Sequence, residues 1–96
     1  MTNRITIKTL RLNADMLNRM TGSPMESYSR DGSGRNVANV GNYHISQAYG
    51  GYALHRMCNE GGGCSDIFNS GHIPARELHN LIWAYARGLE TTKEGA

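Results

Sequence analysis

The sequence predicts an α+β fold: a small antiparallel sheet of three to four strands, an N-terminal helix and a C-terminal amphipathic helix. Residues 43–58 alternate polar with apolar or aromatic side chains around a glycine pair, which is typical of a β-hairpin. Beyond Pro74 the apolar residues change to helical spacing and form one stripe: Leu78, Leu81, Ile82, Tyr85 and Leu89. The economical packing of these elements places both helices on one face of the sheet.

A first helix is expected near the N-terminus. Residues 4–8 alternate, and they fit either a short strand or the lead-in to this helix. Thr9 suits the N-cap, Gly22 suits the position after the last turn, and Pro24 prevents continuation. Four residues at helical spacing are expected to face the core: Leu10, Ala14, Leu17 and Met20. Three polar residues are expected on the solvent-facing side: Asn13, Asp15 and Asn18.

The segment after the first helix, residues 23–36, is rich in Gly, Ser and Arg and is expected to be a mobile surface loop. In the alternative interpretation, Arg30 or Arg35 folds over a bound anion. Residues 37–40 predict a short strand that leads into the hairpin. The polar residues 91–96 are expected to form a frayed tail.

The central hairpin is expected to turn at Gly50-Gly51, which would place Tyr49 opposite Tyr52. The same register would pair Gln47 with Leu54 and Ile45 with Arg56. A glycine-rich loop and a short third strand are expected to follow, before the second helix begins.

Size, composition and charge limit the class of protein. Ninety-six residues form one domain, 1–96, whose core is small because the chain has one Phe, one Trp and twelve Gly. Self-association buries further apolar surface, so a homodimer or larger homo-oligomer is expected. The basic residues are scattered and the net charge is only +2, which does not favour nucleic-acid binding. With no apolar span or secretory segment, a soluble intracellular protein is expected.

The sequence gives little support to catalysis or to a metal site, and we expect neither an enzyme nor a cofactor. The carboxylates are dispersed and the four histidines do not form a ligand run. His44 and His55 are expected to share one face of the hairpin as ordinary hydrogen-bonding residues. Cys58 and Cys64 flank the glycine-rich loop, and free thiols are favoured over a disulfide between them. A zinc site that includes His55 is not favoured, because the spacing matches no standard pattern.

The central stretch suits a small polyanionic ligand with an aromatic base. Tyr49 offers a flat face for stacking, and Asn59 offers the donor and acceptor that read an adenine edge. Gly50 and Gly51 permit close approach of a phosphate to the backbone. Arg76 stands in the first turn of the predicted second helix, where the free N–H groups and the helix dipole attract anions.

Three runs carry a resemblance to a known family: GNYHISQAYGGY at 41–52, NEGGG at 59–63 and AREL at 75–78. Together they resemble short phage-encoded proteins, most of all the first family of Thoeris anti-defence sponges, which sequester cyclic ADP-ribose signals in pockets between protomers. Some members of that family also take cyclic oligonucleotides. The resemblance implies Tyr49 as the stacking aromatic, Asn59 as the base-reading amide and Arg76 as the phosphate-holding arginine.

The chain departs from that family one turn after Arg76, where a second arginine is expected and Asn80 stands instead. Arg87, or Arg30 or Arg35 of the preceding loop, would then supply the missing charge. The resemblance implies a counter-defence sponge in the cytoplasm of an infected bacterial host, which binds a cyclic nucleotide without cleaving it. The alternative is a small phage protein that inhibits a host protein by direct contact, with exposed side chains such as Trp83 as anchors.

Overall fold

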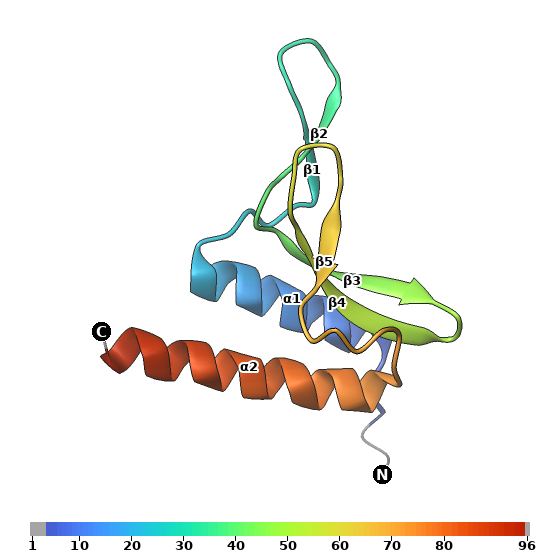
Figure 1. Ribbon diagram of the computed structural model, residues 1–96, viewed down its shortest axis with the longest axis vertical. Coiled ribbons are helices and arrows are strands. Elements are labelled where there is room, and N and C mark those ends of the chain that lie inside the picture. Colours follow the sequence, from blue (N-terminus) through green and yellow to red (C-terminus); the bar gives the residue numbers. More distant parts are fainter. Residues whose placement is uncertain (1–3, 96) are drawn as a thin grey trace.

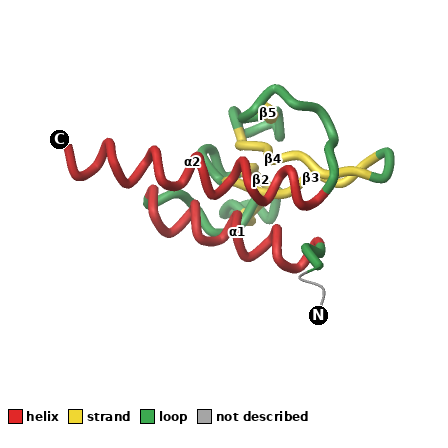
Figure 2. Tube along the Cα trace, turned by 90° about the horizontal axis from the view of Figure 1, so that it is seen from below, coloured by secondary structure: helices red, strands yellow, loops and turns green. Residues whose placement is uncertain are grey.

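The computed structural model describes residues 4–95, except for the side chains of residues 92–95, and it confirms the α+β class (Figure 1). Its elements are α1 (Ile7–Thr21), β1 (Tyr28–Arg30), β2 (Asn36–Ala38), β3 (Tyr43–Ala48), β4 (Gly51–Met57), β5 (Cys64–Asp66) and α2 (Ala75–Gly95). The strands form two antiparallel sheets: a β1–β2 hairpin and a β3–β4–β5 meander. Figures 1 and 2 show α1 and α2 side by side along the meander, with the β1–β2 hairpin projecting away from them.

The first helix begins three residues earlier than expected. Thr6, not Thr9, is the N-cap, and its hydroxyl accepts a hydrogen bond from the Thr9 backbone N–H at 3.4 Å. Residues 4–6 are therefore the lead-in to the helix and not a strand. The prediction for Gly22 is confirmed: it ends the helix in the left-handed conformation at φ 70°.

Two polar residues of α1 that were expected in solvent are buried. Asn18 is 1% exposed and clamps strand β3: its Nδ2 donates to the carbonyl of Tyr43 at 3.0 Å, and its Oδ1 accepts from the Tyr43 N–H at 2.7 Å. Asn13 is also buried, and its amide nitrogen lies 2.8 Å from Nδ1 of His79 on α2. These amides connect α1 to the sheet and to α2, so the solvent-facing prediction holds for neither of them.

The core lies between the two helices and one face of the meander. The fully packed residues come from α1, β3, β4 and α2: Leu10, Ala14, Leu17, Tyr43, Leu54, Leu78, Ile82 and Ala86. The predicted stripe of α2 is correct except at Leu81, which is 38% exposed. Ala86 occupies the inner face instead, because the buried positions repeat at i, i+4 and i+8 from Leu78.

Two segments are more ordered in secondary structure than expected. Residues 28–30 pair with residues 36–38 as a β-hairpin, where a loop and a lead-in strand were predicted. Asp31 closes its turn by accepting hydrogen bonds from the backbone N–H groups of Ser33 and Arg35. The helix α2 continues to Gly95, where a frayed tail from residue 91 was predicted, and Ala96 lies outside the described residues.

The turn of the central hairpin is one residue earlier than predicted. Ala48 pairs with Gly51, so Tyr49 and Gly50 form the two-residue turn, with φ values of 54° and 74°. Positive φ at both turn residues is the geometry of a type I′ turn. The register moves by two residues and Ile45 pairs with Leu54, but the faces are unchanged.

We predict that Asn18→Ala lowers the free energy of unfolding by about 2–6 kcal/mol. The substitution leaves both the N–H and the C=O of Tyr43 buried without the partners they have on Asn18, at about 1–3 kcal/mol for each group. Urea unfolding followed by circular dichroism measures the change. Asp15→Ala, at a half-buried position of the same helix, is the matched control and should stay within about 0.5 kcal/mol of the wild type.

Candidate functional site

The residues that the sequence singles out lie at two ends of the meander. Tyr49 and Gly50 form the tip of the β3–β4 hairpin, and Arg76 lies in the first turn of α2. His72 contacts the ring of Tyr49, with centroids 5.9 Å apart, and it precedes Arg76 by four residues in the chain. We call this group, Tyr49, Gly50, His72 and Arg76, the tyrosine end.

Tyr49 combines extreme exposure with an unfavourable backbone conformation. Its side chain is 98% exposed, and its φ of 54° lies in the left-handed region, which is a genuine outlier for a bulky residue. Asparagine or glycine adopts this position of a type I′ turn more readily. A residue held in such a region raises the free energy of the folded state by about 1–3 kcal/mol, and residues of this kind cluster at functional sites.

The two glycines of the predicted turn have different roles. Gly50 has open space around the position of a Cβ and is suited to its positive φ. Gly51 is buried, and a Cβ there would lie 2.9 Å from the carbonyl carbon of His72 and 3.0 Å from the backbone nitrogen of Ile73. The space beside Gly51 is therefore filled by the protein's own backbone and not by a ligand. This corrects the prediction that Gly51 permits close approach of a phosphate.

Asn59 lies at the opposite end, which we call the glycine-loop end: the loop 59–63 and the β1–β2 hairpin packed on it. The Asn59 side chain closes its own loop, since its Oδ1 accepts a hydrogen bond from the Gly63 N–H at 3.0 Å. Ala38 of β2 donates to the carbonyl of Glu60 at 3.1 Å, which ties the hairpin carrying Arg30 and Arg35 to this loop.

The tyrosine end and the glycine-loop end are separated by the length of β4. Strand β4, Gly51–Met57, spans about 20 Å at strand spacing, and Asn59 lies beyond its far end. One protomer therefore does not bring Asn59 to Tyr49.

Asn80 and Arg87 belong to neither end. They line an open hollow of ≈ 470 Å³ on α2 together with His79, Trp83 and Ala84. Trp83 is 45% exposed, and its ring contacts that of His79 at 6.3 Å between centroids. The predicted contacts on α2 thus divide between its first turn and this hollow.

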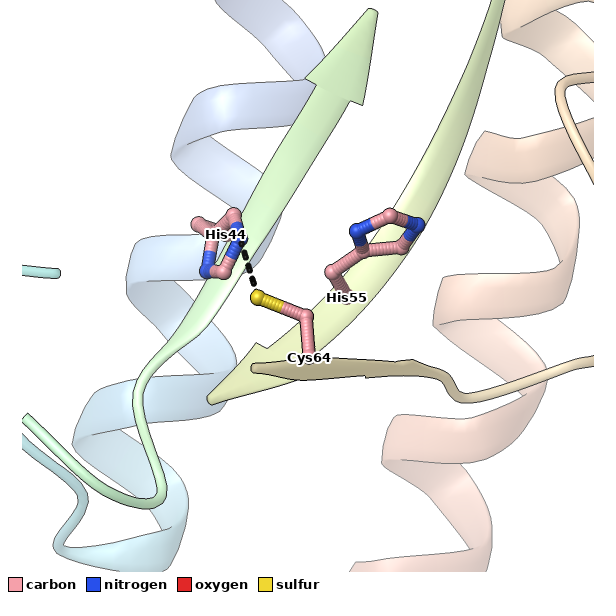
Figure 3. A group of neighbouring side chains, drawn as sticks. All are labelled: His44, His55 and Cys64. Carbon is pink, nitrogen blue, oxygen red and sulfur yellow. Dashed lines mark hydrogen bonds between the residues drawn. The ribbon is translucent and has the colours of Figure 1, made fainter. Parts of the chain in front are cut away.

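The face of the meander turned away from the helices carries a second group of reactive side chains. His44 on β3 and His55 on β4 share one face, as the alternation predicted, and the observed register makes them direct cross-strand partners with ring centroids 5.9 Å apart. Cys64 on β5 adds a thiol whose Sγ lies 3.6 Å from Nε2 of His44. Figure 3 shows these three side chains in front of the strands, with the helices behind. We call them the His–Cys cluster.

Asn42 determines the tautomer of His44. The amide of Asn42 is 1% exposed and its Nδ2 donates to the carbonyl of Pro24 at 2.8 Å, so its Oδ1 is an acceptor. This oxygen lies 3.2 Å from Nδ1 of His44. Nδ1 therefore carries the proton, and Nε2 presents its lone pair to the thiol of Cys64.

Both groups of the resulting hydrogen bond favour their neutral forms. Burial, followed by repulsion from a charged His55, lowers the pKa of His44. Burial, followed by the charge of Cys58, raises the pKa of the Cys64 thiol. A raised thiol pKa is the opposite of what an activated nucleophile requires, so the pair is not arranged for nucleophilic catalysis.

Only part of this cluster could be predicted from the sequence. Alternation placed His44 and His55 together, but the position of Cys64 depends on the loop that separates β4 from β5, where Met57 pairs with Cys64. The three residues are spaced by eleven and nine positions, which matches no local ligand motif. The cysteine beside a histidine is Cys64, whose Sγ lies next to His44.

Comparison with models of known families, with curated proteins and with solved structures finds no match for this chain. Within residues 4–95, no helix is long and apolar enough to cross a membrane.

We predict that Gly51→Ala lowers the free energy of unfolding by about 1–3 kcal/mol, the usual cost of overpacking. The added methyl group meets backbone atoms of His72 and Ile73, which cannot rotate away as a side chain can. Gly88→Ala is the matched control: a Cβ there has open space in the interior of α2 and should stabilise the helix by up to about 1 kcal/mol. Thermal unfolding of the two variants should therefore shift in opposite directions.

Proposed function

We propose that this protein is a counter-defence sponge that binds a cyclic nucleotide messenger and holds it intact in a pocket between two copies of the chain. The messenger is a cyclic ADP-ribose isomer or a cyclic oligonucleotide, and the place of action is the cytoplasm of a phage-infected bacterium. The observation that carries the proposal is Tyr49: an almost fully exposed aromatic ring on a strained turn. The resemblance to Thoeris anti-defence sponges implies that the ring stacks on the base of a cyclic nucleotide.

The surroundings of Tyr49 suit a phosphorylated ligand. His72 contacts its ring, and Ile73 pairs with Tyr52 through backbone hydrogen bonds of 2.8 and 2.9 Å. Two residues later α2 begins, with Arg76 in its first turn. A ring for a base and a helix start for phosphates are thus only a few residues apart.

The second half of the predicted site requires a second copy. Asn59, Arg30 and Arg35 belong to the glycine-loop end, which is separated from the tyrosine end by the roughly 20 Å length of β4. Two copies in a two-fold arrangement bring the tyrosine end of one to the glycine-loop end of the other, twice. Pockets between protomers are also what the resemblance implies.

Capture without turnover fits the chemistry of these residues. Stacking by Tyr49, hydrogen bonds from Asn59 and the charge of Arg76 hold a nucleotide but supply no nucleophile. The thiol of Cys64 and the imidazole of His44 lie on the sheet face, and both favour their neutral forms. A messenger released by heating the complex should therefore be the compound that was added.

A second candidate function rests on the outer face of α2. Trp83, Asn80 and Arg87 surround the open hollow, and tryptophan and arginine are enriched among residues that dominate protein interfaces. This face suits an inhibitor that covers a host protein. Trp83→Ser should then abolish capture of the host protein, whereas under the sponge proposal nucleotide binding does not depend on a host partner.

We predict that Tyr49→Asn weakens binding of the messenger by about 1–3 kcal/mol, the value of one stacked base. The same change should leave the unfolding free energy equal or higher, because Asn-Gly is the preferred sequence for a type I′ turn. Calorimetry with cyclic ADP-ribose isomers and cyclic di- and trinucleotides measures the affinity. Tyr49→Phe keeps the ring and should bind like the wild type; equal affinity in all three proteins removes Tyr49 from the site.

We predict that two defective variants restore binding when mixed. Asn59→Asp retains the oxygen that accepts from Gly63 but loses the amide donor, so its loop stays closed. Refolding it with Tyr49→Asn creates heterodimers in which one of the two shared pockets is intact. Calorimetry of the mixture should then show sites of wild-type affinity that neither variant has alone. A mixture as weak as its components, or monomers in sedimentation, contradicts a shared pocket.

A further inference from the structure

The His–Cys cluster holds three potential metal ligands from three adjacent strands. His44, His55 and Cys64 each offer one donor atom, and these atoms all lie within 4.8 Å of one another. Figure 3 shows them converging on one side of the sheet. Both imidazoles are half-buried and Cys64 is exposed, so an ion reaches the group from solvent.

The spacing of the donors approaches that of a coordination sphere. Nitrogen at about 2.1 Å and sulfur at about 2.3 Å from a tetrahedral ion lie about 3.6 Å from each other. The distance between Nε2 of His44 and Sγ of Cys64 is 3.6 Å. A metal ion therefore replaces the thiol proton between these two atoms with little movement of either, while His55 closes in by about 1 Å.

A fourth donor lies beside the thiol. Met57 is the cross-strand partner of Cys64, and its Sδ is 3.7 Å from Sγ of Cys64. Met57 is 2% exposed, so its thioether is held in place by packing. Two imidazoles, a thiolate and a thioether form a donor set that is softer than the one zinc usually receives in proteins.

Two features outside the donor set favour a cation here. The hydrogen bond from Nδ1–H of His44 to Asn42 orients Nε2 toward the cluster, as the outer partners of metal-bound histidines do. Asp66 lies directly across from His55 in the sheet, and its buried Oδ1 has no hydrogen-bond partner among the described residues. That carboxylate places negative charge beside the cluster.

We propose that His44, His55, Cys64 and Met57 form a binding site for copper in its Cu(I) state. Thiolate and thioether sulfur select Cu(I), and imidazole accepts it as well. On binding, the S–H bond of Cys64 breaks, a Cu–S bond forms, and the proton passes to solvent. Copper remains Cu(I) throughout, so no oxidant or reductant takes part. The site lies on the sheet face, and none of its four ligands is a residue proposed to contact the messenger.

The test is a competition titration of the full chain with Cu(I), kept reduced by ascorbate, against the chromophoric chelator bathocuproine disulfonate. We expect one Cu(I) per chain. Cys64→Ser should weaken binding by at least about 100-fold, because loss of a direct ligand exceeds the effects of outer-shell changes. Cys58→Ser is the matched control, since it removes the other cysteine of the chain, and it should bind like the wild type.

Met57→Leu tests the choice of metal. The change conserves volume in a buried position, so the fold, monitored by circular dichroism, should be retained. We expect weaker Cu(I) binding and unchanged Zn(II) binding in this variant. Wild-type affinity in Cys64→Ser, or an equal loss in Cys58→Ser, overturns the site. Tighter binding of Zn(II) than of Cu(I) by the wild type overturns the assignment to copper.

Discussion

The close approach of the His72–Ile73 backbone to Gly51 is the constraint on which the rest of the structure depends. Because no side chain larger than hydrogen fits there, residue 51 belongs to the strand and the turn falls on Tyr49 and Gly50. The same contact brings the segment before α2 to the hairpin tip. It therefore decides both that an aromatic ring stands on a strained turn and that a helix begins close to it.

The two faces of the β3–β4–β5 meander differ in what they pack against. Tyr43, Leu54 and the inner sides of both helices form a dry core on one face. The other face carries His44, His55 and Cys64, on the side away from α1 and α2. His44 and Cys64 are partnered there: Asn42 satisfies Nδ1 of His44, and the thiol of Cys64 meets its Nε2. In the copper proposal, the thiol of Cys64 on this face exchanges its proton for a metal ion.

Sequence periodicity predicted both helices and the central hairpin, but polar residues at buried positions were wrongly assigned to solvent. Asn13 and Asn18 fall at i+3 and i+8 from Leu10, on the same side of α1 as Leu10, Ala14 and Leu17, and their polarity alone suggested solvent. Their partners, His79 and the Tyr43 backbone, lie on other elements and leave no local signal. The turn was predicted one residue too late for the same reason, because the His72–Ile73 backbone that fills the space at Gly51 is distant in sequence.

The candidate sites differ in how far the sequence could reveal them. Tyr49, Gly50 and Arg76 could be selected from turn and helix-start chemistry, because each depends on local conformation. The separation of Asn59 from Tyr49 also follows from local structure, since strand β4 lies between them. The His–Cys cluster depends instead on two registers at once, β3 with β4 and β4 with β5.

The ring contacts connect these two parts of the sheet. His55 lies 5.9 Å from His44 and 6.1 Å from His72, and His72 lies 5.9 Å from Tyr49, measured between ring centroids. The rings thus form a continuous row from the cluster to the hairpin tip. The Nε2 atom of His72 is also within 3.0 Å of the Ser46 hydroxyl, which anchors the middle of the row to β3. An exposed tyrosine on a two-residue turn thereby has a fixed neighbour on one side, and it presents its other side to whatever binds the tip.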